Sequence, residues 1–307
     1  GCKFTMYVKI IKELVNIARK GSNLTTLRDI YYKDVALFNK NMRLALKVVD
    51  GIARSMHVPS EQLLVVPGLK GLVYGDIVIE HMGTLWLNCT HSPSLIPFFS
   101  LPESPNDASN CIAEFTIYGK SPRAIVVLEK EAIFRSACNN LNDCILITGK
   151  GFPCRLTKRF LTLLATKFER VPILAFVDSD VYGLQICNNY ASCAPHCVSR
   201  LEWAGVHLLE YRQGWLNISD RNWFQMQSFL RVLQSKENGE RKCNEQKWHR
   251  EVTRGMWLYK KSEMNAIDTE YSKYIATKVR QAYHNGELKI PHRKAPGCIE
   301  TRFGALR

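Results

Sequence analysis

The chain has 307 residues, of which 46% are hydrophobic and 23% are charged, a composition typical of globular proteins with enough apolar side chains for two cores. Its uninterrupted apolar runs span only a handful of residues, so no membrane-spanning helix is expected. Lys and Arg total 42 against 28 Asp and Glu, and the resulting net charge of +14 favours a polyanionic partner, nucleic acid before anionic membrane.

Two features bear on cellular context. The sequence begins with Gly1 and shows no secretory segment, so we expect a shortened chain from which targeting signals could be missing. Its 11 cysteines are odd in number and irregularly spaced, which indicates reduced intracellular thiols. The cluster Cys187, Cys193, His196 and Cys197 lacks zinc-finger spacing, so ordinary thiols are favoured over a metal site.

The first third of the chain predicts short helices followed by strands. Apolar residues recur at helical spacing in "MYVKIIKELVNIARKG", which ends at Gly21. In "LTTLRDIYY", Thr26 and Asp29 form a candidate capping box, so a second helix begins there, and "MRLALKVVDGIARSMHV" supplies a third. With the strand-like "LLVVPGLKGLVYGDIVIE", this order suits a winged-helix or helix-turn-helix domain, which we place at residues 1–110. The Pro- and Ser-rich stretch 92–107 reads as a surface connector.

The rest of the chain alternates apolar strands with amphipathic helices. "RAIVVLE", "CILITG", "VPILAFVD" and "GVHLLEY" read as strands, with helices "KEAIFRSACNNL", "RLTKRFLTLLATKF" and "YGLQICNNYA" between them. This alternation predicts an α/β domain, residues 111–307, with a mostly parallel sheet covered on both faces. Long helices follow from Ser219, and a basic tail ends the sequence.

Acidic residues follow two of the predicted strands. Glu129 ends the first strand of the α/β half, and Asp178 ends the third, with Asp180 two residues later. Ligands bind beyond the carboxyl ends of strands in open parallel sheets, so neighbouring strands would bring three carboxylates to one rim. Such oxygen ligands suit Mg²⁺ and, through it, phosphate. The alternative is structural: the aspartates cap the next helix and Glu129 pairs with a lysine.

A glycine turn, "ITGKGFP", follows the second strand of this half. Its two glycines allow a close backbone approach, and Lys150 adds a positive charge. The turn is not a P-loop, since G-x-x-x-x-G-K-[ST] is absent from the sequence. Beside an acidic rim, it suggests a DNA backbone passing over a metal ion.

The helix "LRDIYYKD" offers a candidate nucleophile. Arg28 and Tyr32 are four residues apart and share a helix face, whereas Tyr31 points about 100° away. A guanidinium beside a phenol lowers the phenol's pKa and also binds phosphate. Tyr32 is therefore the better candidate and Tyr31 its packing neighbour. By periodicity alone, however, paired tyrosines are typical of cores and interfaces.

Seven stretches in order resemble the meiotic recombination-initiating transesterases related to the A subunit of topoisomerase VI. They run from about Leu24 to Asp268 and read "LRDIYY", "GLKGLVYG", "SLIPFF", "VLEKEAIF", "ITGKGFP", "VDSDVYG" and "KKSEMNAID". The forms "KGLVY", "EKEAIF" and "GKGFP" are closer to the eukaryotic meiotic enzymes than to archaeal topoisomerases. The resemblance implies an N-terminal winged-helix domain and a Toprim domain.

The resemblance also implies roles for individual residues. The nucleophile matches Tyr32, with Arg28 as its helix neighbour. The Toprim glutamate matches Glu129, as a metal ligand or a general acid or base, and Asp178 and Asp180 match the other metal ligands. The residues that fall where relatives approach DNA are Lys70, Lys150 and Phe152. Departures from the family pattern are Ser179 and Val181 beside the aspartates, and Cys154 after the glycine turn.

The function that the resemblance implies is metal-dependent cleavage of duplex DNA by two copies of the chain. Mg²⁺, with Mn²⁺ as an alternative, would serve as cofactor, and a 5′-phosphotyrosyl link would join protein to DNA. The expected active site is composite, with the tyrosine of one protomer facing the metal of the other. Expected partners are meiotic accessory proteins together with a topoisomerase VI B-like subunit; no membrane is expected, and the expected location is the chromosomes of the nucleus.

Two other functions remain open at this point. The A subunit of a topoisomerase VI would religate its breaks and need an ATPase partner, since this sequence has no ATP-binding signature. A non-catalytic DNA-binding protein could keep the same fold without cleaving DNA.

Overall fold

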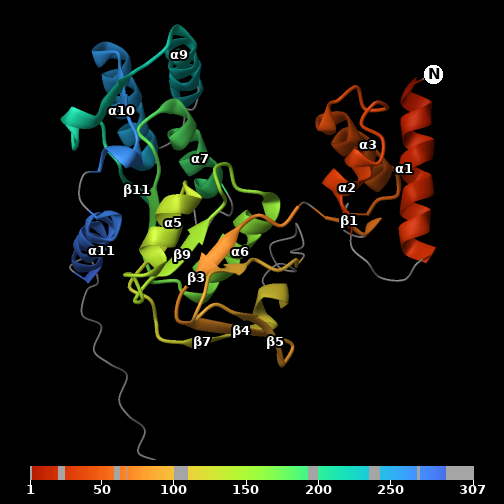
Figure 1. The fold of residues 1–307 in the computed structure, drawn as a ribbon. Helices are drawn as coiled ribbons and strands as arrows, with labels where there is room; N and C mark the ends of the chain where they lie inside the picture. Colours follow the sequence, from red (N-terminus) through yellow and green to blue (C-terminus); the bar gives the residue numbers. More distant parts are fainter. Residues whose placement is uncertain are drawn as a thin grey trace, which may run out of the picture.

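The computed structural model describes a helical unit at the N-terminus and a larger α/β unit, which are set apart in Figure 1. The described residues are 2–19, 25–58, 63–66, 68–99, 110–192, 200–234, 243–267 and 270–287. The mixed α/β class predicted from the sequence is confirmed.

The N-terminal unit packs three helices around one small core. Its elements are α1 (Cys2–Arg19), β1 (Thr25–Thr26), α2 (Leu27–Tyr32), α3 (Met42–Ser55) and β2 (Val65–Val66), and the two strands pair in parallel. Ile10 of α1, Ile30 of α2 and Val49 of α3 meet in the core, so each helix buries the apolar face that its periodicity predicts. The winged-helix assignment itself stays a prediction.

The second helix begins where the capping box was predicted. The backbone N–H of Asp29 donates to Thr26 Oγ1 at 3.1 Å, and the backbone N–H of Thr26 donates to Asp29 Oδ2 at 3.1 Å. Two otherwise unpaired donors at the helix start are thereby satisfied, which fixes the direction in which this short helix leaves β1.

The α/β unit is built on a six-stranded sheet with the order β11-β10-β8-β9-β3-β6. Its strands are β3 (Leu72–Tyr74), β6 (Ser94–Leu95), β8 (Ile125–Leu128), β9 (Ile145–Thr148), β10 (Ile173–Phe176) and β11 (Leu201–Gly205). β8 to β11 run parallel to one another, and β3 and β6 join antiparallel. Every residue of β8, β9 and β10 is buried, as uninterrupted apolar strands predict.

Helices cover both faces of this sheet (Figure 1). They are α5 (Glu131–Cys138), α6 (Arg155–Lys167), α7 (Val181–Ala191), α9 (Asp220–Gln234), α10 (Cys243–Leu258) and α11 (Tyr271–Glu287). Val127 on one face packs in a core with α6, α7, α9 and α10, whereas Val126 and Leu128 on the other face pack with α5 and α11. The alternating directions of strand side chains thus create two separate cores.

Smaller elements surround the sheet. They are a three-stranded sheet of β4 (Ile77–His81), β5 (Thr84–Asn88) and β7 (Phe115–Gly119), the antiparallel pair β12 (Trp215–Asn217) and β13 (Lys260–Ser262), and the short 3-10 turns η2 (Arg212–Gly214) and η3 (Met264–Ala266). The pair β12–β13 matters for the site, because the segment from β13 to η3 passes beside the carboxyl end of β10.

Two sequence assignments are wrong. The last strand of the sheet is Leu201–Gly205, so only the glycine of "GVHLLEY" belongs to it. The rest of that segment turns away, and the backbone N–H of Leu208 donates to Glu251 Oε1 at 2.5 Å. The stretch 92–107, expected as a surface connector, contains β6, and its Ile96 is buried in the sheet core. Residues 100–109, which overlap the end of that stretch, lie outside the described residues.

The boundary expected after residue 110 stays a prediction. The hydrogen bonds of β3 and β6 bear on it, because they join strands from residues 1–110 to the sheet of the second half. The extended segment "LLVVPGLKGLVYGDIVIE" is therefore divided among β2, β3 and β4, which belong to three different sheets.

Two further expectations concern the membrane and the thiols. Among the described residues, no helix is long and apolar enough to cross a bilayer. Cys187 is fully buried in α7, and burial raises the pKa of its thiol, as expected for a structural cysteine. The other three members of the candidate cluster lie outside the described residues.

Candidate active site

The carboxyl ends of three adjacent strands form one rim of the sheet. β8 lies between β10 and β9, and Glu129, Asp178 and the glycine turn follow these strands closely. The backbone N–H of Asp178 donates to Glu129 Oε2 at 2.9 Å. Two acidic residues 49 positions apart in sequence are therefore in direct contact.

Asp178 is held from two sides. Its side chain is buried, and its Oδ1 accepts the backbone N–H of Met264 in η3 at 2.8 Å. Its Oδ2 lies 2.9 Å from the Lys130 Nζ. The Lys130 ammonium and the Met264 backbone N–H, which are far apart in the sequence, together set the orientation of the Asp178 carboxylate.

Asp180 is the N-cap of α7. Its Oδ1 accepts the backbone N–H of Gly183 at 2.8 Å, which satisfies one of the free donors at the helix start. The capping alternative therefore holds for this residue. Its Oδ2 remains near the rim, 3.7 Å from the Lys261 Nζ.

Gly183 allows the tight turn from strand to helix. A Cβ atom at this position would lie 2.2 Å from the carbonyl oxygen of Asp178 and 2.9 Å from its nitrogen. Because these are backbone atoms, they cannot move aside like the end of a flexible side chain. The glycine in "VDSDVYG" thus lets α7 start directly behind Asp178.

Two lysines and a fourth carboxylate complete the rim. Glu263 follows β13, and its side chain lies 3.2 Å from the Lys130 Nζ and 3.1 Å from the Lys261 Nζ. The rim is therefore a network in which ammonium groups alternate with carboxylates. Among its members, Lys130, Lys261 and Glu263 were not identified as candidates from the sequence, although all three lie in the stretches "VLEKEAIF" and "KKSEMNAID".

The protonation of the rim follows from its burial. Burial raises the pKa of Glu129 to about 7, and the nearby negative charge of Asp178 adds to the effect. Burial also raises the pKa of Asp178, although the Met264 N–H and Lys130 oppose the shift. Burial lowers the pKa of Lys130, but its contacts with Asp178 and Glu263 outweigh this and the net shift is upward. Glu129 therefore exchanges a proton near neutral pH.

The glycine turn is tied to the same rim. The backbone N–H of Gly151 donates to the carbonyl oxygen of Glu129 at 2.9 Å. Lys150 has a left-handed backbone with φ of 53°, and its Nζ lies 3.0 Å from Glu131. Phe152 is 43% exposed, and its carbonyl oxygen accepts the Lys70 Nζ at 2.6 Å. The three candidate DNA-contact residues thus lie in one neighbourhood, although their role stays a prediction.

Sequence reasoning missed the buried group that supports the aspartate loop. Ser179, between the two aspartates, donates its hydroxyl to Glu251 Oε1 at 2.7 Å, and its backbone N–H donates to the carbonyl oxygen of Ser262 at 2.8 Å. Glu251 Oε2 lies 2.6 Å from an Arg254 nitrogen. Ser179 and Glu251 are 72 residues apart, so no local pattern in the sequence predicts the contact.

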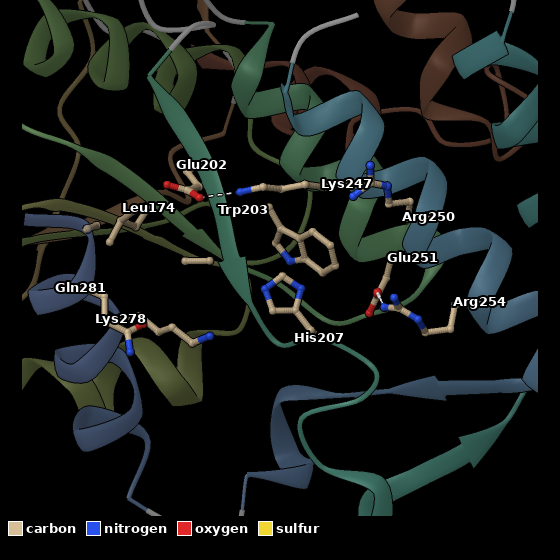
Figure 2. A pocket seen from close by; sticks show the side chains of 12 residues that line it. Leu174, Glu202, Trp203, His207, Lys247, Arg250, Glu251, Arg254, Lys278 and Gln281 are labelled. Atoms are coloured by element: carbon tan, nitrogen blue, oxygen red, sulfur yellow. Dashed lines mark hydrogen bonds and ion pairs between the residues drawn. The ribbon is translucent and has the colours of Figure 1, made fainter. Parts of the chain in front are cut away.

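Figure 2 shows Glu251 and Arg254 on one helix, facing His207 and Trp203. These side chains line a cavity of about 370 Å³. The Lys247 Nζ in this cavity lies 2.5 Å from Glu202 Oε1. Lys247 and Arg254 are thus both paired with carboxylates, and Glu251 connects the wall of this cavity to the aspartate loop through Ser179.

The candidate nucleophile lies on the N-terminal unit. Tyr32 is 64% exposed, whereas Tyr31 is only 9% exposed and packs in the core beside Phe38. Arg28 lies one helical turn before Tyr32, on the same face of α2. In Figure 1, α2, the helix that contains Tyr32, lies away from the six-stranded sheet of the same chain.

The acidic side chains of the rim can be compared with the ligands that a divalent ion requires. Across the described ranges, no group of three His, Cys, Asp or Glu side chains is arranged to hold a metal by itself. Mg²⁺ does not require one, because it commonly binds through one or two carboxylates together with water and substrate phosphate. The Lys130 ammonium lies beside Asp178, so this carboxylate already has a cationic partner within the chain. Carboxylates gathered at one rim therefore fit an ion such as Mg²⁺ that also binds water and phosphate.

Comparison with known proteins decides the family. Residues 124–279, just over half of the chain, match the family model for the Toprim domain that Spo11 shares with the A subunit of topoisomerase 6. Residues 2–65 match the model "Type IIB DNA topoisomerase". The chain belongs to the Spo11/topoisomerase 6A family. The rim described above is thus the carboxyl edge of a Toprim domain.

Named relatives include both meiotic proteins and a topoisomerase component. The chain is 31% identical over 197 residues to the meiosis-specific protein SPO11 of Saccharomyces cerevisiae, covering 60% of this chain and 48% of that protein. It is 29% identical over 190 residues to the human meiotic recombination protein SPO11, covering 60% and 44%. It is 28% identical over 192 residues to the A3 subunit of DNA topoisomerase 6 from Oryza sativa subsp. indica, covering 61% and 40%. The matched region is less than half the length of each relative.

Proposed function

We propose that this chain makes DNA double-strand breaks that initiate meiotic recombination, as a tyrosine transesterase. The observation that carries the proposal is the hydrogen bond from the backbone N–H of Asp178 to the Glu129 carboxylate at the Toprim rim, because it brings two acidic residues together where phosphate chemistry needs them. Two relatives are named as a meiotic recombination protein and a meiosis-specific protein, and these names support the meiotic role. Chromosomal DNA in the nucleus is the corresponding substrate.

In the proposed reaction, the phenolic oxygen of Tyr32 forms a bond to a backbone phosphorus. The bond to the 3′ oxygen breaks, and the protein stays linked to the 5′ end. The phenolic proton passes to water, and the leaving oxygen takes up a proton from Glu129, whose pKa of about 7 suits a general acid. Arg28, one turn away on the same face of α2, binds a phosphoryl oxygen.

Asp178 and Asp180 are the residues that would hold Mg²⁺ or Mn²⁺, and Glu129 would join them as a ligand only in its ionised form. When bound, the ion would supply positive charge against the phosphoryl oxygens. The protein's own contribution is to orient Asp178 through Met264 and Asp180 through Gly183. Lys70, Lys150 and Phe152 would guide the duplex along the glycine turn.

Cutting both strands requires two tyrosines and therefore two copies of the chain. The exposure of Tyr32 and the position of its helix away from the six-stranded sheet of the same chain support a composite site, in which each tyrosine serves the rim of the partner. Meiotic accessory proteins, together with a topoisomerase VI B-like subunit, would assemble the pair.

A second candidate function is that of the A subunit of a topoisomerase VI, which the match to the A3 subunit of rice topoisomerase 6 favours. Such a protein would reseal its breaks. Relaxation of supercoiled DNA in the presence of an ATPase partner would support this function over the meiotic one.

The deciding experiment uses the chain assembled with its partners, duplex DNA and Mg²⁺ or Mn²⁺. After denaturation, DNA covalently attached to protein is measured for wild type, Tyr32→Phe and the matched control Tyr31→Phe. We expect adduct from wild type and Tyr31→Phe and none from Tyr32→Phe. Adduct from Tyr32→Phe would remove this tyrosine from the reaction, and absence of adduct from the assembled wild type would favour a non-catalytic DNA-binding protein.

A further inference from the structure

Lys130 places a positive charge inside the acidic rim. The residue directly follows Glu129 and is the N-cap of α5, but its side chain makes no capping hydrogen bond. Instead, its Nζ lies 2.9 Å from Asp178 Oδ2 and 3.2 Å from Glu263 Oε2. The ammonium group thus stands between two carboxylates from distant parts of the chain.

This position has an energetic consequence. The side chain of Asp178 is 9% exposed and that of Lys130 is 26% exposed. A buried carboxylate without a cation is strongly disfavoured, so the metal-free protein needs the lysine contact. A divalent ion that binds Asp178 needs the same oxygen and is repelled by the same ammonium group.

Glu263 is a second carboxylate with which Lys130 can pair. Its carboxylate already lies within ion-pair distance of Lys130, so the ammonium can leave Asp178 by a small side-chain movement and keep a partner. Lys261 also pairs with Glu263 at 3.1 Å and lies 3.7 Å from Asp180. Glu263 therefore connects both lysines to the two aspartates.

We propose that Lys130 is a resident counter-ion that holds Asp178 in the metal-free protein and must move onto Glu263 before a divalent ion binds. The inference rests on the proposed role of Asp178 as a metal ligand. It assigns to Lys130 and Glu263 the control of metal affinity. Removing the lysine removes a competitor for Asp178, whereas removing the charge of Glu263 removes the position to which the lysine moves.

The test measures binding of Mn²⁺ to the full chain without DNA, from the loss of the free-ion electron paramagnetic resonance signal. We expect Lys130→Met to bind Mn²⁺ about tenfold more tightly than wild type, and Glu263→Gln to bind it several-fold more weakly. Lys247→Met is the matched control, since it removes a lysine that is paired with Glu202 away from the rim. Its affinity should stay within about twofold of wild type.

Three further comparisons make the result decisive. The gain in Lys130→Met should persist in about 0.5 M KCl, where screening is strong, because it arises from contact rather than from the long-range field. Metal-free Lys130→Met should melt at a lower temperature than wild type and recover with Mn²⁺. If that variant does not fold, Lys130→Arg serves instead, and its bidentate hold on Asp178 should weaken Mn²⁺ binding.

The outcomes separate this inference from the proposed function. Mn²⁺ binding by wild type with unchanged or weaker binding by Lys130→Met would overturn the counter-ion role and leave the metal site standing. If Lys130→Met binds Mn²⁺ more tightly than wild type only at low salt, direct competition between the ammonium and the metal for Asp178 is overturned. If neither wild type nor Lys130→Met binds Mn²⁺, the inference and the proposed metal site are both overturned.

Discussion

At the scale of single residues, Ser179 separates the two aspartates of the rim and gives their loop a fixed attachment. Its hydroxyl donates to the buried Glu251, and that carboxylate also accepts the backbone N–H of Leu208. The family resemblance indicates alanine at the position of Ser179, which cannot make the first contact. In this chain, therefore, the geometry of the aspartate loop depends on α10.

Removing the Ser179 hydroxyl should weaken the loop. We expect Ser179→Ala to lower the free energy of unfolding by about 2 kcal/mol, because a hydrogen bond to a charged, buried acceptor is lost. Urea unfolding monitored by circular dichroism measures the change. The control is Ser228→Ala, whose hydroxyl bonds the carbonyl oxygen of Phe224 on the exposed side of α9 and should cost much less. Equal losses in the two variants would contradict a special role for Ser179.

His207 gives the protein a pH-dependent contribution to stability. Burial lowers the pKa of His207, although the carboxylates of Glu210 and Glu251 oppose the shift and Lys278 and Lys247 reinforce it. The unfolded chain, in which this histidine has its ordinary pKa near 6.5, therefore takes up the proton first as the pH falls. The contribution of His207 is present above that pH and is lost below it.

The measurement compares wild type with His207→Asn between pH 7.5 and pH 5 (about 2.5 pH units). We expect wild type to lose more of its free energy of unfolding over this interval than the variant does, by urea unfolding at each pH. A steeper loss in the variant would show that His207 is protonated within the folded protein.

At the scale of elements, the turn from β10 to α7 depends on Gly183. Replacing glycine by alanine inside a helix ordinarily gains about 1 kcal/mol of stability. At this position, the added Cβ would lie 2.2 Å from the Asp178 carbonyl oxygen, so the steric cost exceeds the gain. We expect Gly183→Ala to be destabilised by about 2 kcal/mol or more and to lose metal affinity together with it.

Gly68→Ala is the control for this prediction. An added Cβ at Gly68 meets no atom within 4 Å, and its backbone is not left-handed. Its free energy of unfolding should stay within about 0.5 kcal/mol of wild type. A neutral Gly183→Ala would mean that α7 can shift without disturbing Asp178.

The elements also show how much the sequence could predict. β8, β9 and β10 were identified because they are short, continuous apolar runs between helices, and their order along the chain placed Glu129 and Asp178 at one edge. The strand Leu201–Gly205 was missed because it mixes Glu202 with Trp203 and is followed by the more apolar "GVHLLEY". A long-range contact, from Leu208 to Glu251, decides that the latter segment turns.

The candidate site was predictable only in part for a similar reason. Glu129, Asp178 and Asp180 stand at strand ends, where the parallel-sheet rule finds them. Their partners Lys130 and Glu263 were not predicted, because Lys130 contacts Asp178 and Glu263 across long stretches of chain, 133 residues in the case of Glu263. The spacing of residues carries no information about such pairs until the sheet order is known.

At the scale of the whole molecule, the exposed tyrosine helix and the acidic rim belong to separate units of the fold. A composite site makes a specific prediction for mixtures. Tyr32→Phe retains the rim and Asp178→Asn retains the tyrosine, so each variant alone should form no adduct. A heterodimer contains one complete site, made of the tyrosine of the second variant and the rim of the first.

We therefore expect the mixture, assembled with partners and duplex DNA, to form adducts and to break only one strand. The measurement is the proportion of nicked to linear plasmid, together with protein-linked 5′ ends. In the mixture, no protomer carries both functional groups, so a site formed within one chain would give no product at all. Restored single-strand cleavage is the outcome that distinguishes sharing from self-sufficiency.

The backbone N–H of Gly151 donates to the carbonyl oxygen of Glu129, so the main chain of the glycine turn is joined directly to the main chain of the acidic rim. If the proposed contact of Phe152 with DNA holds, a bound duplex would act directly on the main chain of Glu129, because Gly151 lies next to Phe152 in the sequence.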